Sequence, residues 1–379
     1  MPEDAEDNDT PMLIGARNPF VYAEHKSDDK IKWHEMSLDE KRKKLKDVFK
    51  MPYEELFNPL NEESPLFVQA GDLRPCTTVS NPIWAPNPEG SNYTVTSRLY
   101  KDPVQGDLPD CYFIAALSSL AFLSLIPGKL PPYTYTFYYP PAVVGGTPTA
   151  DRPVVVTDKL PLDATLKYHY SKSCTAGEIW IAMYEKAFAR WINRRNGTDS
   201  DTPDYSKICQ GDPVLALMNL TGWKYTPFDS LTDPDVTTST ATKYSTKNFT
   251  DGTQIFIKIR DSACKTVGAY KVAKFPMVAF TYDPRIEPLP AGVTYTDATI
   301  VGNHSYSVLG VHTIGANNYI VMRNPWGQLD PDPANLPAGA LASGQWYQTA
   351  NLADNSDAIF ALKASVFRDY FKGFGWVYQ

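Results

Sequence analysis

Apolar and polar residues follow a helical pattern in the first half of the chain. Residues 111–125 are apolar on nearly every side, which indicates a helix that lies inside a domain and ends before Pro127-Gly128. Within residues 177–197, aromatic residues recur at spacings of four, four and three, which predicts a second helix with one buried stripe. A third, shorter helix is predicted to begin at Pro213, with Asp212 as its N-cap.

Beyond about residue 225 the pattern changes to short β-branched or aromatic runs separated by polar turns. Such runs predict the strands of an antiparallel sheet or barrel. Helices followed by strands predict an α+β protein, with a helical first lobe, a β-sheet second lobe and a cleft between them. The predicted strand regions are residues 253–259, 275–282, 304–313, 318–324, 357–363 and 374–379.

The same patterns divide the chain into three segments. Residues 1–54 form a highly charged arm, in which Ser37-Leu-Asp-Glu40 predicts the capping box of a short helix. We expect residues 55–224 to form the helical lobe and residues 225–379 to form the β lobe. Up to about residue 105, Pro, Asn and Thr are frequent, so turns and extended segments should dominate there.

Composition and charge narrow the classes of function. A chain of 379 residues with 43% apolar positions can bury a sizeable core. The balance of 36 basic and 43 acidic residues gives no broad electrostatic reason to bind nucleic acid or an anionic membrane. The acidic start lacks the features of a secretory signal, and no run of about 18 apolar residues predicts a membrane span. We therefore expect a soluble, cytoplasmic protein.

The cysteines are widely spaced, odd in number and without any CxxC pair. This spacing argues against a disulfide framework and against a zinc site. Most of them are expected to be small buried hydrophobic residues. They are Cys76, Cys111, Cys174, Cys209 and Cys264.

Cys111 lies where the first buried helix should begin. The start of a helix carries partial positive charge, which favours a thiolate, the form of cysteine that attacks a carbonyl. Gln105 precedes it by six residues, on a loop punctuated by Gly and Pro. The Gln105 side chain and the Cys111 backbone N–H would supply the two donors that an oxyanion needs in acyl transfer. The alternative is a buried structural cysteine beside a solvated glutamine.

His304 and Asn324 are the candidates that would complete such a site. His304 begins a strand-like run after a turn, and an imidazole can exchange the thiol proton near neutral pH. Asn324 ends the next strand before Pro325, where its carbonyl can accept from the imidazole and fix the ring. Trp326 would then shield that hydrogen bond from water. Each residue also has a purely structural interpretation, as a core histidine and as an Asn-Pro turn.

These motifs together resemble one family. The runs QGDLPDCYFIAALSSLA, NHSYSVLGV and RNPWG resemble the nucleophile, histidine and asparagine motifs of calpain cysteine peptidases, and EIWIAMYEKAFAR resembles the helix behind their site. The resemblance covers about residues 95–379. It implies a papain-like core that cleaves protein or peptide substrates through Cys111, His304 and Asn324, with Gln105 as the oxyanion-hole glutamine.

Some positions depart from that family. The Trp that usually follows the nucleophile is Tyr112 here, and the preceding Gly-Asp is Pro109-Asp110, so the loop geometry should differ. A thioester intermediate is open to any well-placed amine, so an acyl transferase (transamidation or peptide ligation) is an alternative to hydrolysis. A non-catalytic binding module on the same scaffold is the third hypothesis, although binding needs no Cys, His and Asn set.

The resemblance also implies calcium, because calpain cores carry oxygen-rich calcium sites that align their lobes. Asp102 matches a carboxylate of the first site, and Asp330 and Asp357 fall near positions of the second. The expected partner Glu of Asp102 is replaced by an apolar run around Leu215. Calcium prefers six to eight oxygen ligands, so the alternative is that these are ordinary acidic residues and that the chain has no cofactor.

Overall fold

The computed structural model describes residues 76, 78, 82–86, 100–141, 146–224, 243–284, 289–295, 300–327, 331–352 and 357–379. The predicted arm (1–54) and its helix lie outside these residues, as does Asp330. The proposed boundaries at 54/55 and 224/225 also involve residues outside them and stay predictions. No helix of the described part has the length and apolar character needed to cross a membrane.

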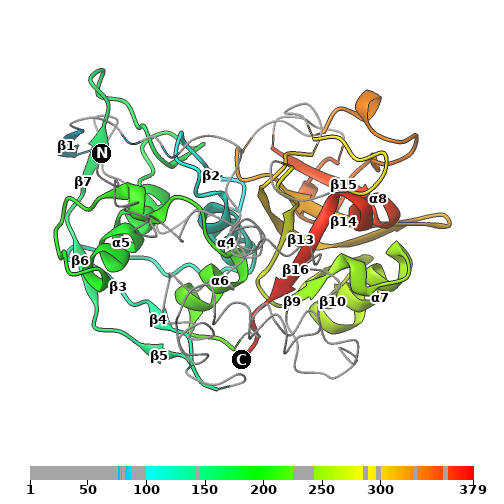
Figure 1. The fold of residues 1–379 in the computed structure, drawn as a ribbon, viewed down its shortest axis with the longest axis horizontal. Helices are drawn as coiled ribbons and strands as arrows, with labels where there is room; N and C mark the ends of the chain where they lie inside the picture. The colour runs from blue at the N-terminus through cyan, green and yellow to red at the C-terminus, as the bar shows by residue number, and fades with distance from the viewer. Residues whose placement is uncertain are drawn as a thin grey trace, which may run out of the picture.

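The described chain combines helices with antiparallel sheets, so the predicted α+β class is confirmed. The helices are α4 (Cys111–Phe122), α5 (Trp180–Arg195), α6 (Pro213–Thr221), α7 (Gly252–Ala263) and α8 (Ala364–Tyr370), and the 3₁₀ turns are η3 (Tyr205–Ile208), η5 (Thr246–Asn248), η6 (Pro333–Asn335) and η7 (Tyr347–Thr349). Figure 1 shows α4, α5 and α6 on one side of the view and α7 and α8 beside the large sheet on the other.

The strands of the first half form only two-stranded ladders. These strands are β1 (Ile83–Pro86), β2 (Pro103–Val104), β3 (Tyr133–Tyr135), β4 (Tyr138–Tyr139), β5 (Thr149–Ala150), β6 (Val154–Val156), β7 (Lys159–Leu162) and β8 (Lys172–Ser173). They pair as β1–β7, β2–β8, β3–β6 and β4–β5, all antiparallel. Because each ladder is short, the helices supply most of the packing in this half.

The second half contains an eight-stranded sheet whose strand pairs are all antiparallel. Its strands are β9 (Lys243–Ser245), β10 (Cys264–Val267), β11 (Tyr270–Ala273), β12 (Met277–Thr281), β13 (Ser305–Ile314), β14 (Asn317–Arg323), β15 (Ile359–Lys363) and β16 (Phe371–Trp376). The order is β10-β11-β13-β12-β16-β9, and β14 joins β13 to β15. The predicted strands from residue 275 onward are therefore present, with small shifts at their ends.

The predicted helices form where the apolar pattern placed them. All four aromatic residues of the α5 stripe, Trp180, Tyr184, Phe188 and Trp191, are buried. Asp212 caps α6 through bonds from Val214 N and Leu215 N. α4 stops at Phe122, three residues short of the predicted end, because the chain turns at Ser124, which has a φ of 57°.

Residues 253–259 were predicted to be a strand, and this prediction is wrong because they lie in helix α7. The buried positions are Ile255, Phe256 and Ile259, which share one face of a helix and would not share one face of a strand. Asp251 precedes the helix and accepts a hydrogen bond from Gln254 N at 2.9 Å. That N-cap stabilises the helical form over the extended one.

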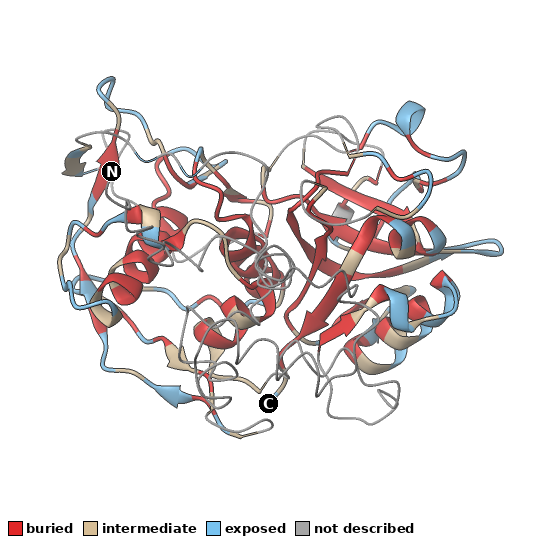
Figure 2. Ribbon diagram, in the orientation of Figure 1, coloured by how far each residue is buried: buried red, intermediate tan, exposed pale blue. Residues whose placement is uncertain are grey.

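Helix α4 is the element that joins the helical part to the large sheet. It is buried along its whole length, as Figure 2 shows. Ser307 on β13 donates to the Ala115 carbonyl at 2.7 Å, and Ser119 of α4 accepts from the Met277 N–H at 2.7 Å. These bonds fix the start of α4 beside the start of β13 (Figure 1).

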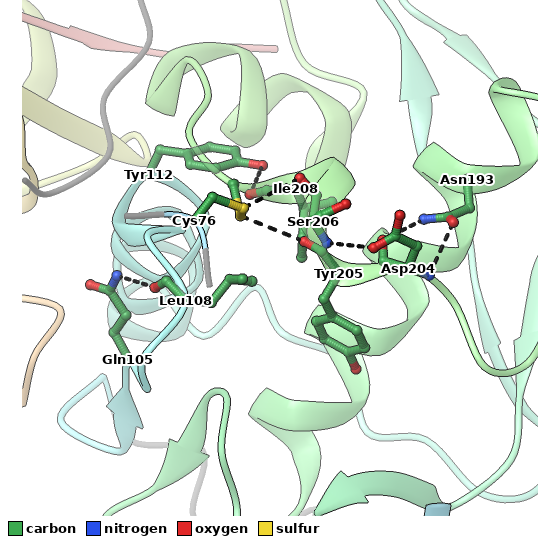
Figure 3. The surroundings of a disulfide bond; sticks show 10 residues. Cys76, Gln105, Leu108, Tyr112, Asn193, Asp204, Tyr205, Ser206 and Ile208 are labelled. Carbon is green, nitrogen blue, oxygen red and sulfur yellow. Dashed lines mark hydrogen bonds between the residues drawn. A yellow bond between two sulfur atoms is a disulfide. The ribbon is translucent and has the colours of Figure 1, made fainter. Parts of the chain in front are cut away.

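Cys76 and Cys209 form a disulfide, which corrects the prediction drawn from the cysteine spacing. The two residues are 133 positions apart, so the pairing depends on the fold and leaves no local signal. Cys111, Cys174 and Cys264 take no part in a disulfide. The expectation that most cysteines are buried is wrong, because only Cys111 and Cys264 are buried, whereas Cys209 is half-buried and Cys76 and Cys174 are exposed. Figure 3 shows the disulfide beside the η3 turn, close to Tyr112.

Candidate active site

Cys111 is the first residue of α4, and its sulfur is not part of a disulfide. The side chain is completely buried, at 0% exposure. Asp110 occupies the N-cap position but makes no side-chain hydrogen bond to the helix start. The thiol therefore lies at the positive end of the helix dipole, where a thiolate is stabilised.

His304 lies immediately before β13, and its backbone is fixed by the neighbouring strand β12. Its N–H donates to Thr281 Oγ1 at 2.9 Å, and its carbonyl accepts from Thr281 N at 3.0 Å. Asn303 before it takes a φ of 49°, a left-handed conformation that Asn tolerates better than most residues. The imidazole is completely buried.

Asn324 follows the last residue of β14 and holds the His304 ring. His304 Nε2 lies 2.9 Å from Asn324 Oδ1, which is the hydrogen bond that the sequence predicted. The same oxygen accepts from the Trp326 backbone N–H at 3.1 Å, so the amide is fixed from a second side. The Trp326 ring lies 5.0 Å from the imidazole, between centroids, where it can exclude water.

Two hydrogen bonds bring these elements together. The Ser307–Ala115 bond joins β13 to α4, and Gln105 N donates to the Pro325 carbonyl at 2.9 Å. Burial raises the pKa of Tyr306 well above its usual value, and negative charge on Cys111 raises it further. Helix α4, which begins with Cys111, therefore packs against β13, whose first residue, Ser305, directly follows His304.

Comparison with known proteins agrees with this geometry. The model of the calpain family cysteine proteases matches residues 89–334, well over half of the chain. The chain belongs to the calpain family. It is 27% identical over 304 residues to a thiol protease of Porphyromonas gingivalis, a match that covers 74% of this chain and 55% of that protein. It is 24% identical over 234 residues to the calpain-type cysteine protease DEK1 of Arabidopsis thaliana, covering 59% of this chain and 9% of DEK1.

Both the family and the Porphyromonas gingivalis relative carry the name of cysteine or thiol proteases. The chain spans little more than half of the first relative and a small part of the second. Activities, substrates and partners of those whole proteins therefore transfer to it only as proposals.

Gln105 lies in the loop that leads to Cys111 in this calpain-family chain, and its side chain is buried. Its Nε2 donates to the Leu108 carbonyl at 2.6 Å, within the loop that leads to Cys111. An amide nitrogen carries two hydrogens, so this bond occupies one of them. Gly106 allows the loop to lie directly against the backbone of Tyr170, because a Cβ at this position would lie 2.2 Å from the Tyr170 carbonyl oxygen.

Tyr112 and Pro109, which depart from the family motif, are bound by the last residue of η3 and by the chain just after it. The Tyr112 hydroxyl donates to the Ile208 carbonyl at 3.1 Å, as Figure 3 shows. The Pro109 carbonyl accepts from Gln210 N at 2.8 Å. Cys209, which forms the disulfide, lies between these two contacts, so the link to Cys76 is anchored in the segment that holds the nucleophile loop.

Sequence reasoning missed a carboxyl pair behind the nucleophile. Glu185 of α5 hydrogen-bonds with Asp110, and both of its oxygens lie 3.2 Å from Ser171 N. Burial raises the pKa of Glu185 to about 7, against the lowering effect of its hydrogen bonds to Asp110 and Ser171. The signal was available: Glu185 follows Tyr184 of the buried stripe, and a buried carboxylate requires a partner.

Two of the three carboxylates proposed for calcium, Asp102 and Asp357, are bound by other side chains, and Asp330 lies outside the described residues. Asp102 Oδ1 accepts from Thr175 Oγ1 at 3.1 Å, and Asp357 Oδ2 lies 2.7 Å from Lys101 Nζ. No group of three or more His, Cys, Asp or Glu residues within the described ranges has the arrangement of a metal site. A lysine ammonium already occupies the position beside Asp357 that a cation would take, so no step of the reaction is assigned to a metal.

Proposed function

We propose that this calpain-family chain is an endopeptidase that hydrolyses peptide bonds through Cys111, His304 and Asn324. The observation that carries the proposal is the 2.9 Å contact between His304 Nε2 and Asn324 Oδ1. Because the amide oxygen can only accept, Nε2 carries the hydrogen, and Nδ1 is the nitrogen that can take up a proton. That tautomer is the one a thiol nucleophile requires of its base.

The reaction would run in two stages. His304 Nδ1 removes the Cys111 proton, the thiolate attacks the peptide carbonyl, and the imidazolium then protonates the leaving amine. In the second stage water loses a proton to His304 and attacks the thioester, which releases the acid and restores the thiol. Asn324 keeps the ring in one tautomer and direction throughout, and Trp326 keeps water from that hydrogen bond.

The oxyanion formed in each stage needs two donors. We assign them to the backbone N–H of Cys111 and to the side-chain amide of Gln105. The bond to Leu108 fixes the orientation of that amide.

We also propose that the helical part and the eight-stranded sheet form the two lobes of a papain-like core, with the peptide bound between them. Cys111 and His304 both have 0% exposure, so a peptide can reach the thiol only after neighbouring groups move apart. Opening before reaction predicts that the rate of inactivation by a large electrophile such as E-64 saturates as its concentration rises.

Location and substrates stay at the level of proposals. Protein substrates follow from the family. The cytoplasmic location expected from the sequence remains a prediction, and the Cys76–Cys209 disulfide argues against it because cytosolic thiols are kept reduced.

Casein hydrolysis by the wild type and by Cys111→Ser and His304→Ala tests the proposal. We expect both variants to lose activity, and we expect His304→Ala to slow alkylation of Cys111 by iodoacetamide. Cys174 provides an internal control: a reagent can reach it, but partial desolvation and the neighbouring Asp102 carboxylate raise the pKa of its thiol, which keeps it a poor nucleophile at neutral pH. Full activity of Cys111→Ser would refute the proposal, and products joined to an added amine would indicate acyl transfer.

A further inference from the structure

Residues 100–105, which we call the strap, lie between the nucleophile helix and the sheet. Lys101 Nζ pairs with Asp357 Oδ2 at 2.7 Å, just before β15. At the other end of the strap, Gln105 N donates to the Pro325 carbonyl. Pro325 lies just after β14, and Asp357 lies just before β15. The strap is therefore bound at two points to the part of the molecule that carries His304 and Asn324.

Arg323 is bound to the strap and to helix α4 at the same time. Its Nη2 donates to the Lys101 carbonyl at 2.6 Å, and its Nη1 donates to Ser118 Oγ at 2.9 Å. Ser118 lies seven residues after Cys111 and in turn donates to the Tyr100 carbonyl at 3.2 Å. Arg323 directly precedes Asn324, so one dipeptide links the nucleophile helix to the side chain that holds the imidazole.

The charges in this cluster balance without an added ion. Arg323 is completely buried, and desolvation lowers its pKa to about 10, while the charges of Asp357 and Asp102 act in the opposite direction. The Asp357 oxygens are already bound by Lys101 Nζ and by Ile359 N at 3.0 Å. A divalent cation would have to displace the lysine and lie close to a buried guanidinium, which costs electrostatic energy.

We propose that Lys101 and Arg323 are positioning residues that align Cys111 with His304 and Asn324, and that this chain needs no calcium for that alignment. The inference rests on the proposed function and goes beyond it. The Lys101 and Arg323 side chains supply the positive charge that joins the strap and helix α4 to the large sheet. A forked guanidinium is suited to this role, because it can bond the strap and the helix at fixed angles.

The first experiment compares Lys101→Met with Lys101→Arg and with a matched control, Arg152→Met. Arg152 forms an exposed ion pair with Asp199 on the outside of the helical part. We expect Lys101→Met to lower kcat for a peptide substrate roughly 10- to 100-fold with little change in KM, since small displacements of reacting groups have effects of that size. Lys101→Arg should recover most of the loss, and Arg152→Met should match the wild type.

A second readout separates positioning from stability. The pH dependence of Cys111 alkylation should shift towards that of an ordinary thiol in Lys101→Met, because the imidazole is no longer aligned with the sulfur. Asp357→Asn should produce the same shift. A variant that is only less stable would show a lower unfolding temperature with the alkylation profile of the wild type, and that result would overturn the proposal.

Independence from calcium can be tested separately. Wild-type activity and alkylation should be the same in EGTA and in millimolar calcium, and titration calorimetry with calcium chloride should show no binding. Activity that disappears in EGTA and returns with calcium would overturn the inference. If Cys111→Ser kept full activity, the proposed function would fail instead. If Cys111→Ser were inactive but Lys101→Met were unchanged, only the positioning role would be wrong.

Discussion

The Glu185–Asp110 pair behind the nucleophile leads to a prediction about stability and pH. In the unfolded chain the Glu185 carboxyl loses its proton near pH 4.5, whereas burial keeps it protonated to about pH 7 in the folded chain. Between these two values the unfolded state binds fewer protons than the folded state. The contribution of Glu185 to the free energy of unfolding therefore falls as the pH rises from about 4.5 to about 7, and then stays constant.

The size of the effect follows from the two pKa values. They differ by about 2.5 pH units, and each unit corresponds to about 1.4 kcal/mol, so the loss is roughly 3 kcal/mol. Tyr205 lies against the same pair, but burial and the charges of Glu185 and Asp110 raise its pKa well above 10. It therefore stays neutral in this range, and the slope belongs to the carboxyl pair.

Glu185→Gln removes the ionisation, and its amide oxygen can still accept from Ser171 N and from Asp110. We expect the variant to lose the slope, so that its stability relative to the wild type increases by roughly 3 kcal/mol from pH 5 to pH 8. Urea unfolding followed by tryptophan fluorescence measures this, since Trp180 and Trp191 are buried.

Asp163→Asn serves as the control for that series. Hydrogen bonds from Thr165 lower the pKa of this exposed carboxyl, so it titrates below the range tested. Its curve should run parallel to that of the wild type between pH 5 and pH 8. A Glu185→Gln curve that also ran parallel to the wild type would refute the assignment of the proton to this pair.

Two further substitutions test the loop around the nucleophile. Gly106→Ala should lower peptidase activity at least tenfold and stability by about 1–3 kcal/mol, because its Cβ would lie 2.2 Å from the Tyr170 carbonyl oxygen; peptide hydrolysis and thermal unfolding measure this, and unchanged activity would contradict it. Tyr112→Phe should cost about 1–2 kcal/mol in urea unfolding, because the Ile208 carbonyl loses its donor; a loss no larger than that of an exposed Tyr→Phe substitution would count against that role.

Local patterns carried most of what the sequence could predict. The α5 stripe follows the period of a helix, and the Asp212-Pro213 start of α6 is a helix signal contained in two residues. The His304–Asn324 contact joins residues on paired strands only 20 positions apart, within one hairpin. Patterns of this kind depend on residues close together in the sequence, so they can be recognised without knowledge of the fold.

The misread or missed features depend on long-range contacts or on competing local signals. Residues 253–259 contain apolar residues on more than one face, and the Asp251 cap that decides for a helix lies outside that run. The Lys101–Asp357 ion pair spans 256 positions, and the disulfide spans 133. Only the folded chain brings such partners together, so neither pair left a recognisable spacing in the sequence.

The Cys76–Cys209 link also affects how the protein should be handled. A thiol reagent added to keep Cys111 from oxidising will also attack the disulfide, in which Cys76 is exposed. The sample can then exist in two covalent forms with the same mass to within two hydrogens. Titration with Ellman's reagent under denaturing conditions distinguishes them: the linked form has three free thiols and the fully reduced form has five.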